Sequence, residues 1–477
     1  MNRSVTRAMS ACYGSPLSAM KTATLRLFVG TAAALAAALP AQTQEASKPW
    51  RLNEALGGPS WIKWSGRHRT RFESMNKQFR AGNRPVAEDQ WFVRTSIRAD
   101  LDFGRLGGTA ELMDSRAWGD NPNRQVSTAF VNTTDFVEAN AIYNFDAPKG
   151  HTSRLLAGRY TMSLGSRRFV IRNGFRNTVN TFTGLDYLWK DDQDQQLRMF
   201  WTMPVRRRPF DAEAMRDNEF AWDDQDRDLQ FFGVFSAKNI SASTKLEAYV
   251  YGLREDAPDS TNRRLVTPGL RVHRPKKKGD WYGEAEVALQ GGTSQSSAGS
   301  NVDLNHQAWF SRLALGYRWD SKYDWTVLLA YDYASGDKDP NDGENNRFDS
   351  LYGAPRFEYC PTGLWGFVQR TNFKTPELRV SFRPTDRTWI MLSARDLHLA
   401  SATDAWAKSK VRDPSGASGD DVGQQYELRA RYDVFKKNMF VEVGGAYLVA
   451  DDFFDNAPNS PNGGDRMMGF VEMRWTF

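Results

Sequence analysis

Arginine recurs at every second position in several short stretches of this chain. One side of the alternation in 61–73 carries Arg67, Arg69 and Arg71, and 91–103 carries Arg94 and Arg98. The guanidinium group is planar, stays charged and pairs with carboxylates through two parallel hydrogen bonds. Rows of such side chains predict weak, repeated contacts with an anionic solute. The candidate contact residues are Arg67, Arg69, Arg71, Arg94, Arg98, Arg159, Arg312, Arg379, Arg383, Arg429, Arg431 and Arg474.

Carboxylates lie on the same faces as these arginines. They are Asp100, Asp102, Glu138, Glu284, Glu286, Glu377, Glu427 and Glu472. Two roles for the arginines therefore stay open. They either contact a solute, at roughly 0.2–1 kcal/mol for each exposed pair, or they pair with these acids and hold the wall rigid.

The alternation also predicts the elements that position these residues. The opposite face of 91–103 carries Val93, Thr95, Ile97 and Ala99, because successive side chains of a strand point to opposite sides of the sheet. Such two-sided runs recur from about residue 60 onward, and we count about 18 of them. The predicted fold class is all-β, a transmembrane antiparallel β-barrel with long extracellular loops and short periplasmic turns. A barrel of this size leaves a water-filled channel rather than a packed core.

The alternative is a soluble β-sandwich whose charged side faces bulk water. Connection lengths argue against it, because short and long ones alternate as they do in bacterial barrels. Short connections are expected at 104–108, 146–153, 320–324, 384–387 and 435–438, and long ones at 75–89, 204–228, 336–372, 400–423 and 450–467. The mean hydropathy of −0.61 with 13% aromatic residues also fits strands that face water on one side and lipid on the other.

The two ends of the sequence indicate export and assembly. Residues 1–41 combine basic residues with a short Ala/Leu-rich run, as in a signal peptide, with Met20 as an alternative start. The run is too short for a membrane anchor, so we expect a barrel over 42–477 in the bacterial outer membrane. The alternating strand that ends in Trp475 and Phe477 predicts a signal for the barrel-assembly machinery.

The sequence gives little indication of nucleic-acid binding, catalysis or metal binding. Without the four basic residues that precede position 42 the chain is close to neutral, which argues against nucleic-acid binding. The five histidines are scattered and no G-x-S-x-G or H-E-x-x-H motif is present, so we expect no enzyme. Asp337, Asp339 and Asn341 have the spacing of calcium ligands, but the glycine is displaced from its EF-hand position. We expect no cofactor, with weak calcium binding in this outer loop as an alternative.

Several segments resemble the alginate export porin family. They are Gly158-Arg159-Tyr160, Arg167-Arg168-Phe169-Val170, Phe175-Arg176-Asn177, Phe182-Thr183-Gly184 and, most specifically, Asn346-Arg347-Phe348-Asp349-Ser350-Leu351-Tyr352-Gly353. The resemblance implies an outer-membrane barrel of 18 strands, an electropositive lumen and passage of an acidic polysaccharide. The chain departs from the family pattern at Ser166 and at Ile171-Arg172, and its connection at 435–438 is very short. Uptake and a general pore therefore stay open beside gated secretion.

The leading hypothesis is a monomeric porin for an anionic, alginate-like polysaccharide or oligosaccharide in contact with outer-membrane lipid. A general anion-selective porin for small solutes is the first alternative. An outer-membrane barrel hydrolase is the second, and it lacks a recognisable nucleophile and base.

Overall fold

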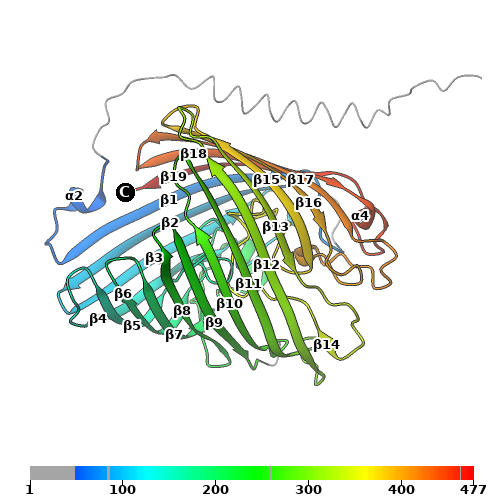
Figure 1. The fold of residues 1–477 in the computed structure, drawn as a ribbon, viewed down its shortest axis with the longest axis horizontal. Coiled ribbons are helices and arrows are strands. Elements are labelled where there is room, and N and C mark those ends of the chain that lie inside the picture. The colour runs from blue at the N-terminus through cyan, green and yellow to red at the C-terminus, as the bar shows by residue number, and fades with distance from the viewer. Residues whose placement is uncertain (1–48, 83–85, 258–259, 462) are drawn as a thin grey trace, which may run out of the picture. The chain divides into compact units, whose positions relative to one another are not determined.

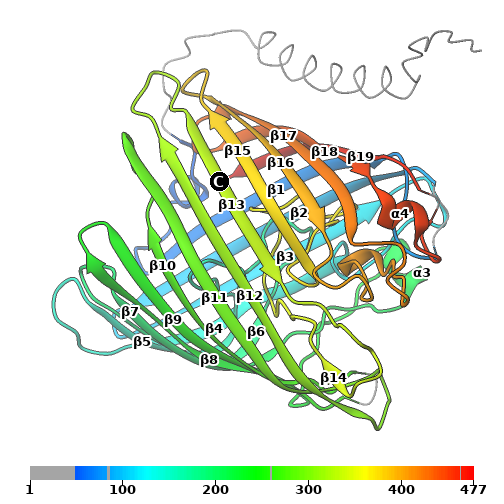
Figure 2. The ribbon, with the colours of Figure 1, turned by 45° about the vertical axis from the view of Figure 1, so that its right-hand side comes forward.

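The computed structural model describes residues 49–477 except 83–85, 258–259 and 462. The predicted signal peptide at 1–41 lies outside these residues. Within them, one antiparallel sheet curves round until its last strand, β19, pairs with its first, β1 (Figures 1 and 2). The closed wall has 18 strands in this described part of the chain, which confirms the predicted fold class.

The wall strands follow one another in chain order. They are β1 (Ile62–Met75), β2 (Glu88–Phe103), β3 (Leu106–Trp118), β4 (Asn132–Asn144), β5 (Thr152–Tyr160), β6 (Phe182–Lys190), β7 (Gln196–Pro204), β8 (Leu229–Ser241), β9 (Thr244–Glu255), β10 (Arg264–Arg274), β11 (Asp280–Gln295), β12 (Asp303–Arg318), β13 (Thr326–Ala334), β15 (Phe373–Phe382), β16 (Thr388–His398), β17 (Asp421–Phe435), β18 (Met439–Ala450) and β19 (Arg466–Thr476). A further short strand, β14 (Glu344–Asn345), pairs in parallel with β12.

The helices are short and lie in connections. They are α2 (Leu52–Leu56), α3 (Ala212–Arg216), α4 (Asp452–Asn456) and the 3-10 turn η1 (Ala407–Ser409). Among the described residues, no helix has the length and apolar character needed to cross a membrane. In Figures 1 and 2, α4 and β14 lie at the end of the barrel opposite α2 and the C-terminus.

The strands are two-sided, as the alternation predicted. Large apolar side chains such as Ile97, Leu313 and Leu329 are exposed on the outside, where lipid would cover them. Stacked aromatic pairs lie near both ends of the wall, for example Trp325 with Phe382, whose ring centroids are 4.2 Å apart. The predicted short turns and long loops fall at opposite ends of the strands.

Candidate functional site in the barrel lumen

Two long connections turn back into the barrel, and we call them the inward segments. The first inward segment, 161–181, joins β5 to β6. Its Asn177 is fully buried and donates from its side-chain amide to the carbonyl oxygens of Arg116 at 3.0 Å and Phe130 at 2.6 Å. Arg69 of β1 donates in turn to the Asn177 side chain at 2.9 Å. This segment is therefore fastened to the wall made by β1–β4.

The second inward segment, 346–372, joins β14 to β15. The backbone N–H of Leu364 donates to the Glu73 carboxylate of β1 at 2.7 Å. The indole N–H of Trp365 donates to the Gln425 side chain of β17 at 3.1 Å. Because these contacts lie on two different strands, the segment is tied to more than one part of the wall.

The two inward segments also hold each other. The Tyr352 N–H donates to the Phe169 carbonyl at 2.9 Å, and the Ile171 N–H donates to the Tyr352 carbonyl at 3.2 Å. The guanidinium carbon of Arg356 lies 3.9 Å from the ring centroid of Phe175. The most specific segment of the family resemblance, 346–353, thus includes the contact between the two inward segments.

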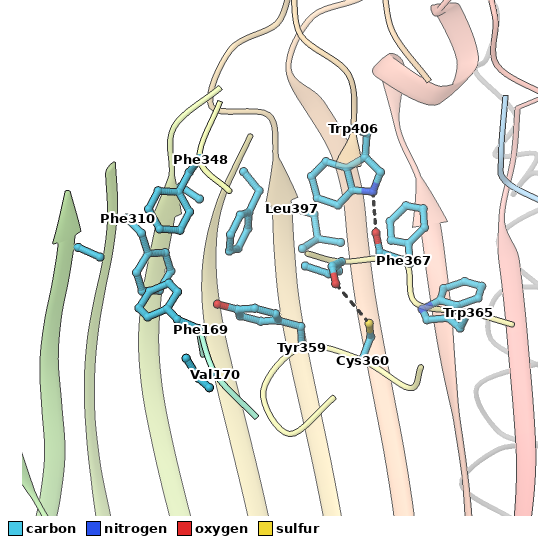
Figure 3. Packing of buried hydrophobic residues seen from close by; sticks show 14 of the residues in the cluster. Phe169, Val170, Phe310, Phe348, Tyr359, Cys360, Trp365, Phe367, Leu397 and Trp406 are labelled. Carbon is cyan, nitrogen blue, oxygen red and sulfur yellow. Dashed lines mark hydrogen bonds between the residues drawn. The ribbon is translucent and has the colours of Figure 1, made fainter. Parts of the chain in front are cut away.

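Apolar side chains pack around this contact. In Figure 3, Phe169 and Phe348, one from each inward segment, lie beside Phe310 of β12, and Tyr359 lies nearby. The ring centroid of Phe169 is 5.6 Å from that of Phe310 and 5.7 Å from that of Phe348. The expectation of a channel without a packed core is therefore wrong at this level of the barrel, because the inward segments bring aromatic residues that bury one another.

Buried ion pairs join the inward segments to the wall. Arg168 is 2% exposed and pairs with Glu284 and Glu286 of β11 and with Glu358 of the second segment. Burial opposes both charges, but the ion pairs outweigh it, so the pKa of Arg168 lies well above and that of Glu358 well below the ordinary value. Removing Arg168 would leave buried Glu286 without its ion-pair partner, and an uncompensated buried charge costs about 3–5 kcal/mol.

Three of the predicted solute contacts are buried within the wall. Arg69, Arg71 and Arg312 are between 0% and 3% exposed. Arg71 lies 2.7 Å from Glu73 and 3.3 Å from Glu472. Arg69 and Arg71 hold the wall and the first inward segment together, while Arg312 pairs with Glu284 of β11 and Asp332 of β13.

Seven further predicted arginines keep partial exposure. The contacts are Arg98 with Asp100 and Glu138, Arg159 with Asp135, Arg379 with Glu377, Arg429 and Arg431 with Glu442, Arg474 with Glu472, and Arg94 with the carbonyls of Gly174, Arg176 and Asn177. Most of the predicted ladder therefore has a protein partner.

Two of the predicted arginines have accessible side chains without a close carboxylate. Arg67 is exposed, and its side chain makes no hydrogen bond or ion pair within the described residues. Arg383 has a side chain that is 46% exposed, and its nearest carboxylate, that of Asp324, is 3.9 Å away. These positions fit the prediction of accessible positive charge better than the buried arginines do.

The predicted acids pair with arginines, with one exception. Glu138 accepts from Arg98 and Arg172, Glu284 and Glu286 from Arg168, Glu377 from Arg395, Glu427 from Arg356, Glu472 from Arg474, and Asp100 from Arg98. Asp102 instead accepts from the Gly104 N–H at 3.0 Å in the turn after β2. Several partners, such as Arg168, Arg172 and Arg356, lie in the inward segments and have no strand alternation to reveal them. Arg395 lies on β16 and the alternation could have found it.

A polar cavity of about 350 Å³ lies between the inward segments and the outer loops, and we call it the outer cavity. Arg80, Arg176 and Arg207 line it, and none of its lining residues is Asp or Glu. Its other polar lining residues are Gln125, Ser127, Asn173, Asn180, Thr181, Ser350, Thr362 and Gln369. The three arginines come from loops, where strand alternation gives no signal.

These three cations have no carboxylate partner among the described residues. Arg207 donates to the carbonyls of Thr128 at 2.8 Å and Val179 at 3.0 Å, and Arg176 donates to the Asn180 side chain at 2.6 Å. Burial, with Arg207 and Arg94 nearby, holds the pKa of Arg176 well below the ordinary value. Burial also lowers the pKa of Arg80 to about 10 and that of Arg207. An anion in the outer cavity would relieve this accumulation of buried positive charge.

The candidate calcium loop remains a prediction. The Asp339 carboxylate accepts from the Asn341 N–H at 3.0 Å, and the Asp337 carboxylate accepts from the Asn346 N–H at 3.5 Å. The described residues contain one close group of three His, Cys, Asp or Glu side chains, and it lies elsewhere, at Asp396, His398 and Asp421.

The predicted assembly residues lie at the barrel seam. Phe477 exchanges backbone hydrogen bonds with Gly66 of β1, at 2.7 Å and 2.9 Å. Its ring covers Gly66, and its centroid is 5.9 Å from that of Trp475. These contacts show a structural role, while recognition by the assembly machinery remains a prediction.

Comparison with solved structures shows the same fold in Pseudomonas aeruginosa porins. OccK8 (OprE) is 12% identical, with a TM-score of 0.56, over 87% of this chain and 98% of that one. OccK2 (OpdF), solved in complex with glucuronate, gives the same values. OpdQ is 13% identical, with a TM-score of 0.54, over 87% of this chain and 97% of that one.

Sequence comparison gives the family. No curated protein matches the sequence. The model of the family described as Alginate export matches residues 60–466, which include all but the last part of the barrel wall. The chain therefore belongs to the Alginate export family, and it is a porin-like β-barrel of the bacterial outer membrane.

Proposed function

We propose that this barrel conducts anionic saccharides and holds a carboxylate-bearing sugar transiently in the outer cavity. The observation that carries the proposal is the composition of that cavity, which has three arginines and no acid in its lining. Its volume of about 350 Å³ is near the lower end of the roughly 300–1,000 Å³ typical of small-molecule pockets.

The chemistry of the lining suits a sugar acid. Arg80, Arg176 and Arg207 supply charged donors for a carboxylate, while amides and hydroxyls such as Asn173 and Ser127 suit the hydroxyl groups of a sugar ring. Conduction needs sites that are favourable enough to enter but weak enough to leave. Arginines already satisfied by backbone carbonyls meet this need, because they exchange existing hydrogen bonds for new ones.

The comparisons support the same class of solute. The family is described as Alginate export, and alginate is a polymer of sugar acids. One structural neighbour was solved with glucuronate, which is also a sugar acid. The family and the barrel fold also favour a channel without enzymatic activity.

The test is ion selectivity and sugar block of the purified barrel in a planar bilayer. We expect anion selectivity and a saturable block by oligouronates. Arg176→Gln and Arg207→Gln should each weaken the block about tenfold, the equivalent of about 1.4 kcal/mol. A general anion porin would instead keep its selectivity with no saturable block, and cation selectivity would contradict both possibilities.

Arg124→Gln is the matched control. Arg124 lies in the neighbouring loop and, like Arg207, donates to carbonyl oxygens, those of Gly119 and Arg216, but it does not line the outer cavity. Its replacement should leave the block unchanged. An equal loss of block in the Arg124 and Arg207 variants would show that overall charge, and not the cavity, controls the solute.

A further inference from the structure

A second cavity lies at the other end of the lumen, and we call it the periplasmic pocket. It has a volume of about 180 Å³ and is lined by Arg383, Arg387, Trp389, Arg431 and Asp433. These residues lie next to the short turns at 383–387 and 436–438, so the pocket opens at the periplasmic mouth. It shares no lining residue with the outer cavity.

Trp389 forms an aromatic wall of this pocket inside the barrel. Its neighbours on β16 alternate between the two sides of the sheet: Leu392 is 39% exposed toward lipid, whereas Met391 is 3% exposed on the lumen side with Trp389. Trp389 lies opposite Arg431 on β17. The indole ring therefore faces the solute path and does not belong to the outer aromatic girdle.

Arginines are interleaved with aromatic rings around Trp389. The guanidinium carbon of Arg429 is 5.2 Å and that of Arg431 is 6.0 Å from the Trp389 ring centroid. Arg431 is also 4.3 Å, and Arg474 5.1 Å, from the Phe440 ring centroid. A flat aromatic face offers a large apolar surface, which matches the C–H face of a pyranose ring.

The charges of the pocket are only partly compensated. Arg431 gives two hydrogen bonds to Glu442, at 2.8 Å and 2.5 Å. Arg387 donates to the Val434 carbonyl at 3.2 Å and has no ion pair among the described residues, and Arg383 lies 3.9 Å from its nearest carboxylate. Donors on Arg383 and Arg387 therefore stay available beside the exposed edge of the pocket.

We propose that the periplasmic pocket is a second subsite for one residue of a carboxylated saccharide. The pyranose ring stacks on Trp389, and Arg383 and Arg387 pair with the carboxylate. The inference rests on the proposed function for the class of solute, but it concerns a separate place in the lumen. A chain of sugar acids then meets a weak site at each mouth, which gives binding in series without tight capture.

The experiment measures block by oligouronates added to one side of single channels at a time. Recordings of the Arg207→Gln variant serve as the reference for orientation. The side of addition on which this variant weakens the block is the side that the outer mouth faces. Trp389→Ala should weaken block from the opposite side about tenfold and leave block from the outer side unchanged, while Trp389→Phe should keep most of it. Arg383→Gln with Arg387→Gln should give the same one-sided loss, and it tests the proposal even when Trp389→Ala does not fold.

Trp325→Ala is the matched control. Trp325 lies at the same end of the barrel but stacks on Phe382 on the outside of the wall. Its replacement should leave block from both sides unchanged. Unchanged periplasmic-side block in both the Trp389 and the Arg383/Arg387 variants would overturn the subsite while the outer block still supports the proposed function. Absence of any block in the unaltered protein would instead overturn the proposed function itself.

Discussion

Gly353 lies directly against the carbonyl oxygen of Arg168. A Cβ atom at position 353 would lie 1.6 Å from that oxygen, a distance that no side chain tolerates. The contact joins the two inward segments at the residue whose guanidinium group pairs with three glutamates. The absence of a side chain at position 353 thus allows the lumen to be narrowed by two segments packed backbone to backbone.

Gly353→Ala should loosen the inward segments without opening the barrel. The added methyl group forces the two backbones apart, and overpacking of this kind costs about 1–3 kcal/mol. We expect faster hydrogen exchange at 346–372 and noisier single-channel current. Gly174→Ala is the control in the other inward segment, because a Cβ there would meet nothing within 4 Å. Equal behaviour of the two variants would contradict the close contact.

Arg67 and Arg71 lie on the same strand and should respond differently to replacement by Gln. Arg71→Gln leaves buried Glu73 without its ion-pair partner and takes one of three arginine partners from buried Glu472, which should lower the free energy of unfolding by about 3–5 kcal/mol. Arg67→Gln removes an exposed charge and should reduce anion selectivity with little change in stability. Heat resistance of the barrel and the reversal potential in a salt gradient measure the two effects. A large loss of stability in the Arg67 variant would contradict this assignment.

Docking of the outer loop 205–228 should weaken as the pH rises. Burial, with Asp135 nearby, raises the pKa of Asp223 to about 6 from an ordinary value of 3.8. The docked loop then holds the proton more tightly than the free loop, so docking is strongest below pH 4 and weakens as the pH rises through 6. The loss is on the order of 2–3 kcal/mol. Protease sensitivity of the loop between pH 4 and 8 measures it.

Asp223→Asn should remove this pH dependence. The Asn132 side chain, which donates to Asp223 at 2.7 Å and has an unsatisfied oxygen, can turn its amide to accept from the new side chain. Asp226→Asn is the control in the same loop, because its carboxylate is 42% exposed and pairs with Arg206 at the surface. A pH response that survives in the Asp223 variant would assign the titration to another group.

Phe477→Ala should reduce the yield of assembled barrel. The ring covers Gly66 of β1 at the seam, so its loss exposes the last backbone pairing of the closed sheet. Phe435→Ala is the control, because this ring lies at the same end but is 49% exposed on its own strand. The heat-modifiable fraction on a gel measures assembly. Normal yield without the Phe477 ring would contradict the predicted role.

The wall of this protein could be predicted from its sequence because strand alternation is a local signal. Arg94 and Ile97 face opposite sides as their positions require, and the short turns fall where polar residues interrupt the alternation. The ion pairs made by the inward segments could not be predicted, since a partner such as Glu358 reaches Arg168 through a contact 190 residues apart. Local patterns carry no information about which loop enters the lumen.

The outer cavity could not be predicted from the sequence for the same reason. Arg80, Arg176 and Arg207 lie in three connections without periodicity, and only the folding of the inward segments brings them together. The motif at 346–353 carries the family resemblance, but the sequence does not show its physical role, which is the contact of Tyr352 and Gly353 with 168–171.

The strands of the wall and the connecting loops have different roles, and this affects how such a channel can diversify. The strands contribute closure and a lipid-facing surface, while Arg80, Arg176 and Arg207 of the outer cavity all come from connections. Under the proposed function, exchanging those connections would alter which solute is admitted without changing the residues of any strand. A barrel that keeps its wall could thus acquire new cargo preferences one loop at a time.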